Sequence, residues 1–433
     1  MASTAPPFPD APPARPCPDA LPTAPCGGAP PTVEAQATLP EHLTEEILLR
    51  LPTAADLARA SMADPSLRRI IADHSFLRRF RTLHPPPLLG ILLTTSFLPA
   101  QPPHPSAAAA RALADTDFSC SFLPSRERPW IRCDFRDGRA LLCVDHQDLF
   151  MFRDIAVCDP MHRRYLLLPP VPWYRPDLVD HCEAFLAPTG GDEGTDIAAD
   201  APFRFRVMCL AKYRTKLVLF AFSSSGPGAG QWHTVTFDGW RSLVAGITDG
   251  DDAGSSIDFQ NRYYAHGCFW WPIPQINKLL MLHMGTMEFS SVSLPHSPWN
   301  NCQMAFVEAR EGRLGMFTLN FNPENYAYYL WYTILQSNGE GTRQWEMENR
   351  LTLPDDDYHF KILGVAGGYL LLQAFTKQMW WIPSFQSPKF DSYCFSLDLQ
   401  TMKLDRFCGV GAILSSSVDL YAGFPPSLSP PTI

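Results

Sequence analysis

Two pairs of histidine and cysteine residues come closest to a reactive site in this chain. Cys182 directly follows His181, and Cys268 lies two residues after His266. A thiol beside an imidazole can act as a nucleophile, and both side chains bind zinc. Neither pair has a third and fourth partner at a recognisable spacing, so we expect buried strand residues. The sequence therefore predicts no catalytic residue, no metal site and no cofactor.

Acidic runs and a glycine pair offer weaker signals of ion or phosphate binding. Residues 355–357 are three consecutive aspartates, three more aspartates lie between 249 and 252, and Gly367 is followed by Gly368. Acidic clusters in turns are mostly hydrated loops. The glycine pair lacks the strand-turn-helix setting and the other glycines of a dinucleotide loop. We expect no ligand at any of these positions.

Tryptophan residues are the best candidates for contacting another molecule. Trp270-Trp271 and Trp380-Trp381 each precede a proline-containing segment, and Trp173 lies in a comparable VPWYRPD sequence. Neighbouring residues in a strand point to opposite faces, so one tryptophan of each pair should face outward. Exposed tryptophans often anchor binding surfaces. These five residues are our candidates for binding a target protein; the alternative is that they cover the edges of a core.

Composition bounds the class of protein. The chain has 433 residues, of which 46% are hydrophobic and 12% aromatic, enough for two or three domains with a large core. A net charge of -9 argues against a nucleic-acid partner, which needs clustered basic surface. The arginines between residues 59 and 81 fit solvated helix faces.

Cysteine usage and hydropathy indicate where the protein works. The twelve cysteines include no C-x-x-C pair, so they are expected to be buried reduced thiols. No run approaches the roughly 18 apolar residues of a membrane span, and the N-terminus does not read as a signal peptide. We expect no membrane partner and a location in the cytoplasm, the nucleus or both.

The chain divides into four parts by composition. Residues 1–36 are rich in Pro and Ala and predict a disordered leader. Residues 37–84 have a helical period, residues 85–425 read as short strands between turn residues, and residues 426–433 read as a flexible tail. The sequence HPPP at 84–87 predicts a stiff joint between the two central parts.

Residues 39–80 predict three or four short helices. Leu43, Ile47, Leu48 and Leu51 recur with a helical period, and Pro52 ends this first helix. An Asp-Pro pair at 64–65 and Ser75 are expected to cap later helices. A unit of about 40 residues is too small to bury a complete core. Part of its apolar surface should therefore face another chain or domain.

This helical stretch resembles the F-box, the adaptor-docking motif of SCF-type ubiquitin ligases. The matching parts are LP at 39–40, ILLRLP at 47–52, Leu57-Ala58 and FLRRF at 76–80; Leu67 stands where many members have Trp. The resemblance implies binding to a Skp-family adaptor, and through it to a cullin. The implied contact residues are Leu39, Pro40, Leu43, Ile47, Leu48, Leu51, Pro52 and Leu57. The alternative is an ordinary helical subdomain packed on the rest of the protein.

The strand-rich part repeats one theme, a strand, a tight turn and a second strand that often ends in Leu-Pro. The clearest copies are 157–170, 218–237, 281–295, 332–354 and 393–410. Their starts lie about 50–65 residues apart, at or slightly above the range of propeller blades. This part resembles the kelch-like, propeller-forming F-box-associated domains of plant F-box proteins. We expect five blades and a sixth built from 88–98 and 118–135; a β-sandwich array is the alternative.

Together these features predict a multidomain protein, a small all-α F-box followed by an all-β propeller of five or six blades. The resemblance implies a non-catalytic substrate-recognition subunit of an SCF-type E3 ubiquitin ligase, with the propeller binding an unidentified target protein. A second hypothesis is a propeller that binds a small molecule or glycan, or is an enzyme, with helices packed on it. A third is a purely structural interaction protein.

Overall fold

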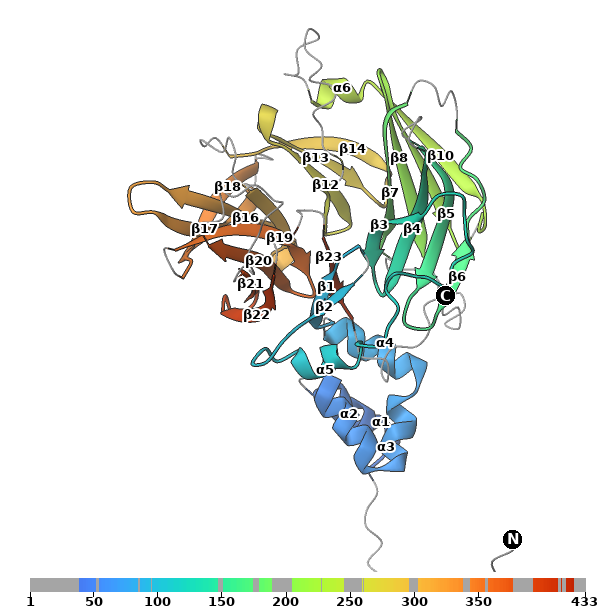
Figure 1. Ribbon diagram of the computed structural model, residues 1–433, viewed down its shortest axis with the longest axis vertical. Coiled ribbons are helices and arrows are strands. Elements are labelled where there is room, and N and C mark those ends of the chain that lie inside the picture. The colour runs from blue at the N-terminus through green and yellow to red at the C-terminus, as the bar shows by residue number, and fades with distance from the viewer. Residues whose placement is uncertain are drawn as a thin grey trace, which may run out of the picture.

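A computed structural model shows a small helical unit beside a ring of β-sheets (Figure 1). The residues it describes are 39–51, 54–84, 86–94, 96–146, 151–173, 179–188, 205–226, 228–244, 259, 261–295, 303–337, 343–354, 357–376, 392–411, 414 and 418–423. The predicted leader and tail, Pro52, and the pair Trp380-Trp381 lie outside these residues.

The helical unit contains four helices, where the sequence predicted three or four. They are α1 Glu41–Leu49, α2 Ala54–Ala63, α3 Pro65–Ile71 and α4 His74–Leu83. Asp64 caps α3 as expected, because its side chain accepts a hydrogen bond from the Ser66 amide. The expected cap at Ser75 is wrong. Asp73 caps α4 by accepting hydrogen bonds from two backbone amides of the first turn.

The four helices enclose a core of their own, which corrects the expectation that the unit is too small to do so. Its buried members are Leu48, Leu49, Leu57, Ile70, Ile71, Phe76, Leu77 and Phe80. Each helix is short, yet one apolar stripe from each meets at the centre of the bundle. The apolar surface left over is therefore confined to outward-facing residues.

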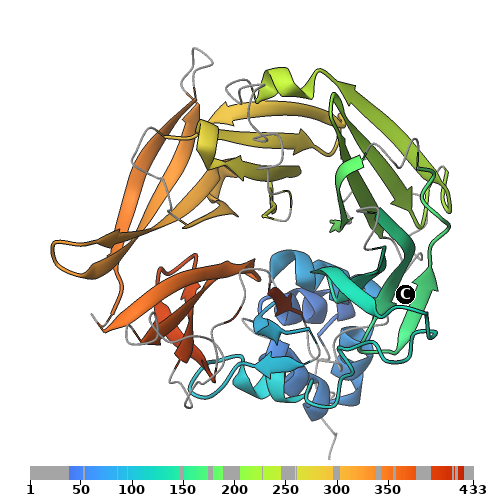
Figure 2. The same ribbon diagram turned by 45° about the horizontal axis from the view of Figure 1, so that its top comes forward.

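The strand-rich part is a six-bladed β-propeller, whose ring of sheets is visible in Figure 2. Five blades are four-stranded antiparallel meanders. They are β3–β6 (Trp130–Arg136, Arg139–His146, Met151–Asp159, Arg164–Leu167), β7–β10 (Val179–Ala187, Arg206–Tyr213, Lys216–Ser223, Trp232–Asp238), β11–β14 (Tyr263–Ala265, Cys268–Ile273, Lys278–His283, Glu288–Ser293), β15–β18 (Gln303–Glu308, Leu314–Asn322, Ala327–Ser337, Arg343–Thr352) and β19–β22 (Tyr358–Ala366, Tyr369–Thr376, Ser392–Asp398, Leu404–Val410).

The five repeated sequence segments are the last two strands of these five blades. The first strand of each blade lies innermost, since β3 contacts β7, β11 contacts β15, and β15 contacts β19. Inner and middle strands have a neighbouring blade on each face, so both of their faces are buried. The β-sandwich alternative is excluded by this arrangement.

The sixth blade is assembled from both ends of the propeller. Its three strands lie in the order β2 (Phe97–Pro99), β1 (Leu88–Leu92) and β23 (Asp419–Ala422). The segment 88–98 was correctly assigned to this blade, but the assignment of 118–135 was wrong, because residues 130–136 form β3 of the next blade. Pairing the C-terminal strand with β1 closes the ring and leaves no open edge inside it.

The joint between the two parts is fixed to the propeller. The Gly423 amide donates a hydrogen bond to the Pro87 carbonyl oxygen, at 3.1 Å. At Gly367, φ is +58° and a Cβ atom would lie 2.5 Å from the Pro86 carbonyl oxygen, so only glycine fits. The helical unit is thus attached at the face where the inner strands end, next to short helix α5 (Ala107–Arg111). Helix α6 (Trp240–Leu243) lies far from the helical unit (Figure 1), and two short 3-10 helices, η3 (Pro274–Ile276) and η4 (Arg310–Gly312), follow it in the chain.

Candidate functional site

One row of apolar side chains on the helical unit faces solvent. Leu39, Leu43 and Ile47 are 57%, 43% and 53% exposed, and Pro40 beside them is also exposed. Leu43 and Ile47 are four residues apart and so lie on one side of α1, because a helix turns once every 3.6 residues, and Leu39 lies just before the N-cap residue Pro40. Large apolar side chains gathered on one side of a helix indicate a surface that a partner covers. We call these three residues the α1 row.

The structure separates the α1 row from the other residues implied by the F-box resemblance. Leu48 and Leu57 are 4% and 0% exposed and belong to the core of the helical unit, so the expectation that they enter a partner is corrected. Leu51 is half-buried against the same core. The physical reason is that Leu48 follows Ile47 by 100° around the helix and faces the bundle, not solvent.

Ion pairs hold α1 on its neighbours. Arg69 of α3 lies 3.2 Å from the Glu41 carboxylate, and Arg79 of α4 lies 2.6 Å from the Glu45 carboxylate. Water and salt screen such exposed pairs, so they contribute little to stability. These ion pairs join α1 to α3 and α4, and so they fix the orientation of the α1 row. These arginines are surface residues, as the sequence predicted.

Three of the five tryptophans expected to bind a target, Trp173, Trp270 and Trp271, are among the described residues, and they lie in the propeller. Trp270 and Trp271 are only 5% and 0% exposed, and their Nε1 atoms donate hydrogen bonds to the carbonyl oxygens of Ala265 and Phe259. The expectation of one outward-facing ring is wrong because β12 is covered by a blade on each face. Trp173 is half-buried, with its ring centroid 5.1 Å from that of Phe220.

The histidine and cysteine pairs are structural. The His266 Nε2 atom lies 2.7 Å from the Arg313 carbonyl oxygen, and Cys268 is buried in β12. Burial raises the pKa of the Cys182 thiol well above its ordinary value, which disfavours a nucleophilic thiolate. In the part of the chain that the structure describes, the cysteines are reduced and all but Cys133 are buried. No three His, Cys, Asp or Glu side chains there are placed to hold a metal ion.

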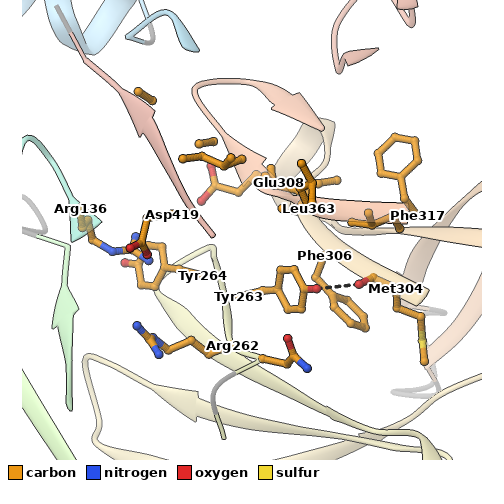
Figure 3. Close-up of a pocket in the computed structure, with 18 of the residues that line it drawn as sticks. Arg136, Arg262, Tyr263, Tyr264, Met304, Phe306, Glu308, Phe317, Leu363 and Asp419 are labelled. Carbon is orange, nitrogen blue, oxygen red and sulfur yellow. Dashed lines mark hydrogen bonds between the residues drawn. The ribbon is translucent and has the colours of Figure 1, made fainter. Parts of the chain in front are cut away.

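A cavity of about 1990 Å³ occupies the centre of the ring (Figure 3). We call it the central cavity. Its walls come from the inner strands β3, β7, β11, β15, β19 and β23. Figure 3 shows Arg136 beside Tyr264, and Tyr263 with Phe306 and Met304. The Tyr263 hydroxyl donates a hydrogen bond to the Met304 carbonyl oxygen at 2.6 Å, which joins two blades.

Buried ion pairs lie in the wall of the central cavity. The Arg262 guanidinium lies 2.9 Å from the Asp134 carboxylate and also pairs with Glu183. Burial alone would lower the pKa of Arg262, but these two carboxylates raise it above its ordinary value. The three residues come from or directly precede β3, β7 and β11. They therefore tie three successive blades together at the centre of the ring.

A second ion pair secures the closing blade. Arg132 of β3 lies 2.6 Å from the Asp419 carboxylate of β23 and also donates hydrogen bonds to the carbonyl oxygens of Leu92 and Leu93. Burial raises the pKa of Asp419, and Arg132 opposes this shift. Sequence reasoning missed both ion-pair groups. Their members lie up to 287 residues apart and share no motif.

Comparisons with known proteins give no family for this chain. A scan of protein-family models and a search of curated proteins both found no match. Among solved structures, one from a study of two prolyl endopeptidases is similar at 12% identity with a TM-score of 0.27. The match covers 79% of this chain, and the chain spans only 60% of that protein.

A second solved structure, a luciferin-regenerating enzyme, is similar at 10% identity with a TM-score of 0.26; the match covers 69% of this chain and 82% of that one. Neither likeness is close enough to carry an argument about function. Within the described residues, every helix is too short or too polar to cross a membrane.

Proposed function

We propose that this protein is a substrate-recognition subunit of an SCF-type ubiquitin ligase. In this proposal the helical unit is an F-box that binds a Skp-family adaptor, and through it a cullin, while the propeller binds a target protein. The observation that carries the proposal is the α1 row, three large apolar side chains left exposed on a unit whose core is otherwise complete.

The energetics of docking are adequate only because the helical unit is pre-organised. Burying an apolar side chain of this size contributes about 1.5–3 kcal/mol, and association costs about 4–15 kcal/mol. The α1 row alone therefore does not supply tight binding. Ion pairs from Arg69 and Arg79 already hold α1 in place, so little further ordering is needed. Backbone and polar contacts around the row must supply the rest.

The mechanism is proximity. A target held on the propeller would present its lysines near a conjugating enzyme brought by the other subunits, which raises their effective concentration. The closed ring and the fixed joint at Pro87 suit this role, because a rigid scaffold keeps the distance between adaptor and target constant. In this proposal the chain itself does no chemistry.

The proposal is tested by measuring binding of the full chain to a purified Skp-family adaptor by isothermal titration calorimetry. The double variant Leu43→Asp/Ile47→Asp should weaken binding at least 100-fold, because it puts two carboxylates into an apolar contact. Met62→Asp is the matched control, since Met62 is a 71%-exposed apolar residue on α2 outside the row. Circular dichroism should be the same for all three proteins.

Three outcomes separate the hypotheses. Wild-type protein that ignores the adaptor overturns the proposal, as does a double variant that binds as well as Met62→Asp. Adaptor binding without cullin recruitment or ubiquitin transfer supports a purely structural interaction protein instead. Leu48→Asp is unsuitable for this test, because Leu48 lies in the core and its variant would unfold the helical unit.

A further inference from the structure

The basic side chains that line the central cavity are not all neutralised. Arg132 and Arg262 are both ion-paired with carboxylates, as described above. Arg136 and Lys361 also line the cavity and are partly buried, yet neither forms an ion pair with any described residue. A charge withdrawn from water without a partner is unfavourable and calls for an explanation.

Arg136 is the more unusual of the two. It is the last residue of β3, and its guanidinium carbon lies 5.3 Å from the Tyr264 ring centroid and 5.8 Å from that of Phe269. Its Nε atom is buried and donates no hydrogen bond to any described residue. The two rings hold the guanidinium in position but leave its hydrogen-bond donors unused. The N–H groups of this guanidinium are therefore free to donate hydrogen bonds to a ligand in the cavity.

Lys361 lies on β19, at another part of the cavity wall. Its Nζ atom donates a hydrogen bond to the Leu414 carbonyl oxygen at 2.8 Å, a neutral acceptor. Burial lowers the pKa of this ammonium group, since a carbonyl oxygen compensates only part of the lost hydration. An anion in the cavity would oppose this shift.

Acidic residues do not cancel these two charges. Asp137, Glu308 and Glu348 also line the cavity but are exposed, so water and salt screen them. The buried carboxylates are three in number and face the two paired arginines, an excess of one negative charge. Arg136 and Lys361 add two positive charges. Arg136 and Lys361 are therefore partly buried basic groups of the wall that no carboxylate of a described residue pairs.

We propose that the central cavity binds a small organic anion, and that Arg136 is the residue that bonds its carboxylate or phosphate group. A guanidinium presents parallel N–H donors that match either group with two hydrogen bonds. The volume of about 1990 Å³ exceeds the roughly 300–1,000 Å³ of typical ligand pockets, so the cavity is large enough for a metabolite-sized anion. This site goes beyond the proposed ligase role and does not depend on it.

Charged and neutral probe pairs test the site in the full chain at low ionic strength. Isothermal titration calorimetry would compare benzoate with benzamide, and glucose 6-phosphate with glucose. At least one anion should bind while its neutral counterpart does not, and added KCl should weaken the binding. The two pairs show whether a carboxylate or a phosphate is preferred. Binding by neither anion, or equal binding by a neutral counterpart, overturns the proposal.

Variants assign the binding to Arg136. Arg136→Gln should weaken anion binding at least tenfold, and Arg206→Gln should not, because Arg206 is an exposed arginine of β8 outside the cavity. If Arg136→Gln fails to fold, Arg136→Lys keeps the charge, loses the fork and should bind several-fold more weakly. Wild-type affinity in either folded variant contradicts the assignment. Adaptor binding measured on the same proteins should be unchanged, which keeps this test separate from the ligase proposal.

Discussion

The helical unit and the propeller treat similar apolar residues in opposite ways. Ile47 of α1 and Trp271 of β12 both lie in strongly apolar runs, yet Ile47 is half exposed and Trp271 is fully buried. Each helix of the four-helix unit has one side that faces the core and one that faces solvent. Apolar residues on the outer side of α1 are therefore exposed. A middle strand of a blade has a neighbouring blade on each side and no outside.

This difference indicates which residues of each part can form a partner surface. In the propeller, apolar strands mark the spaces between blades, and the binding group that we propose is a polar residue that faces the central cavity. In the helical unit, an apolar residue that the bundle does not cover is itself the candidate surface. The same hydropathy pattern therefore has a different meaning in a helix that is covered on one side and in a strand that is covered on both faces.

Replacing Trp271 tests the buried side of the comparison and should give the largest effect. Trp271→Ala removes a ring that packs against Phe185 and Phe269, and should lower the free energy of unfolding by about 3–5 kcal/mol. Urea denaturation followed by tryptophan fluorescence measures the change. Met347→Ala is the control, since Met347 is exposed on edge strand β18. Equal stability of the two variants would contradict the assigned burial.

Replacing Ile47 tests the exposed side of the comparison. Ile47→Ala should change the free energy of unfolding by less than about 0.5 kcal/mol, because no core is disturbed. Leu57→Ala in the same unit should cost about 2–5 kcal/mol. Both are measured by urea denaturation followed by circular dichroism. A destabilised Ile47→Ala would mean that the α1 row supports the fold, which removes the basis for the docking proposal.

The smallest expected effect is a pH dependence of stability. It comes from Asp64, which caps the start of α3 in the helical unit. Hydrogen bonds from the Ser66 hydroxyl and amide lower the pKa of Asp64 in the folded state. A lowered folded-state pKa stabilises the fold above the unfolded pKa of about 3.9, and this contribution is lost as pH falls through the folded value. Asp64→Asn keeps the cap and removes the titration.

Thermal unfolding midpoints of the helical unit at about pH 5 and pH 3 measure that contribution. Wild-type protein should lose slightly more stability on acidification than Asp64→Asn, because only the aspartate gains a proton. Asp115→Asn, an exposed position outside the helical unit, serves as the control. Identical acid sensitivity in all three proteins would show that the Asp64 cap does not contribute.

Local sequence signals were reliable where a single element carries the information. The Asp64-Pro65 pair predicted the start of α3, and turn-separated strand pairs located the outer half of five blades. Errors arose where two acceptors compete or where faces are assigned. Ser75 was expected to cap α4, but the helix begins at His74, so Ser75 lies inside the first turn and Asp73 accepts the hydrogen bonds of the free amides. Leu48 was expected to face a partner, but the bundle covers it.

The central cavity could not be predicted from the sequence at all. Arg136 looks like any arginine beside a turn, and only the ring places it against Tyr264, 128 positions later in the chain. The pairing of Arg132 with Asp419 depends in the same way on closure of the sixth blade. Such contacts are long-range, so no local spacing or composition records them.

By itself the sequence determined the helices of the first part and the repeating strands of the second, because helix caps, turn residues and hydrophobic period act over a few neighbouring residues. Tertiary structure alone decided which apolar residues stay exposed and which charges remain unpaired. Both depend on what lies on the far side of each element, and that is fixed only when the four helices pack and the ring closes.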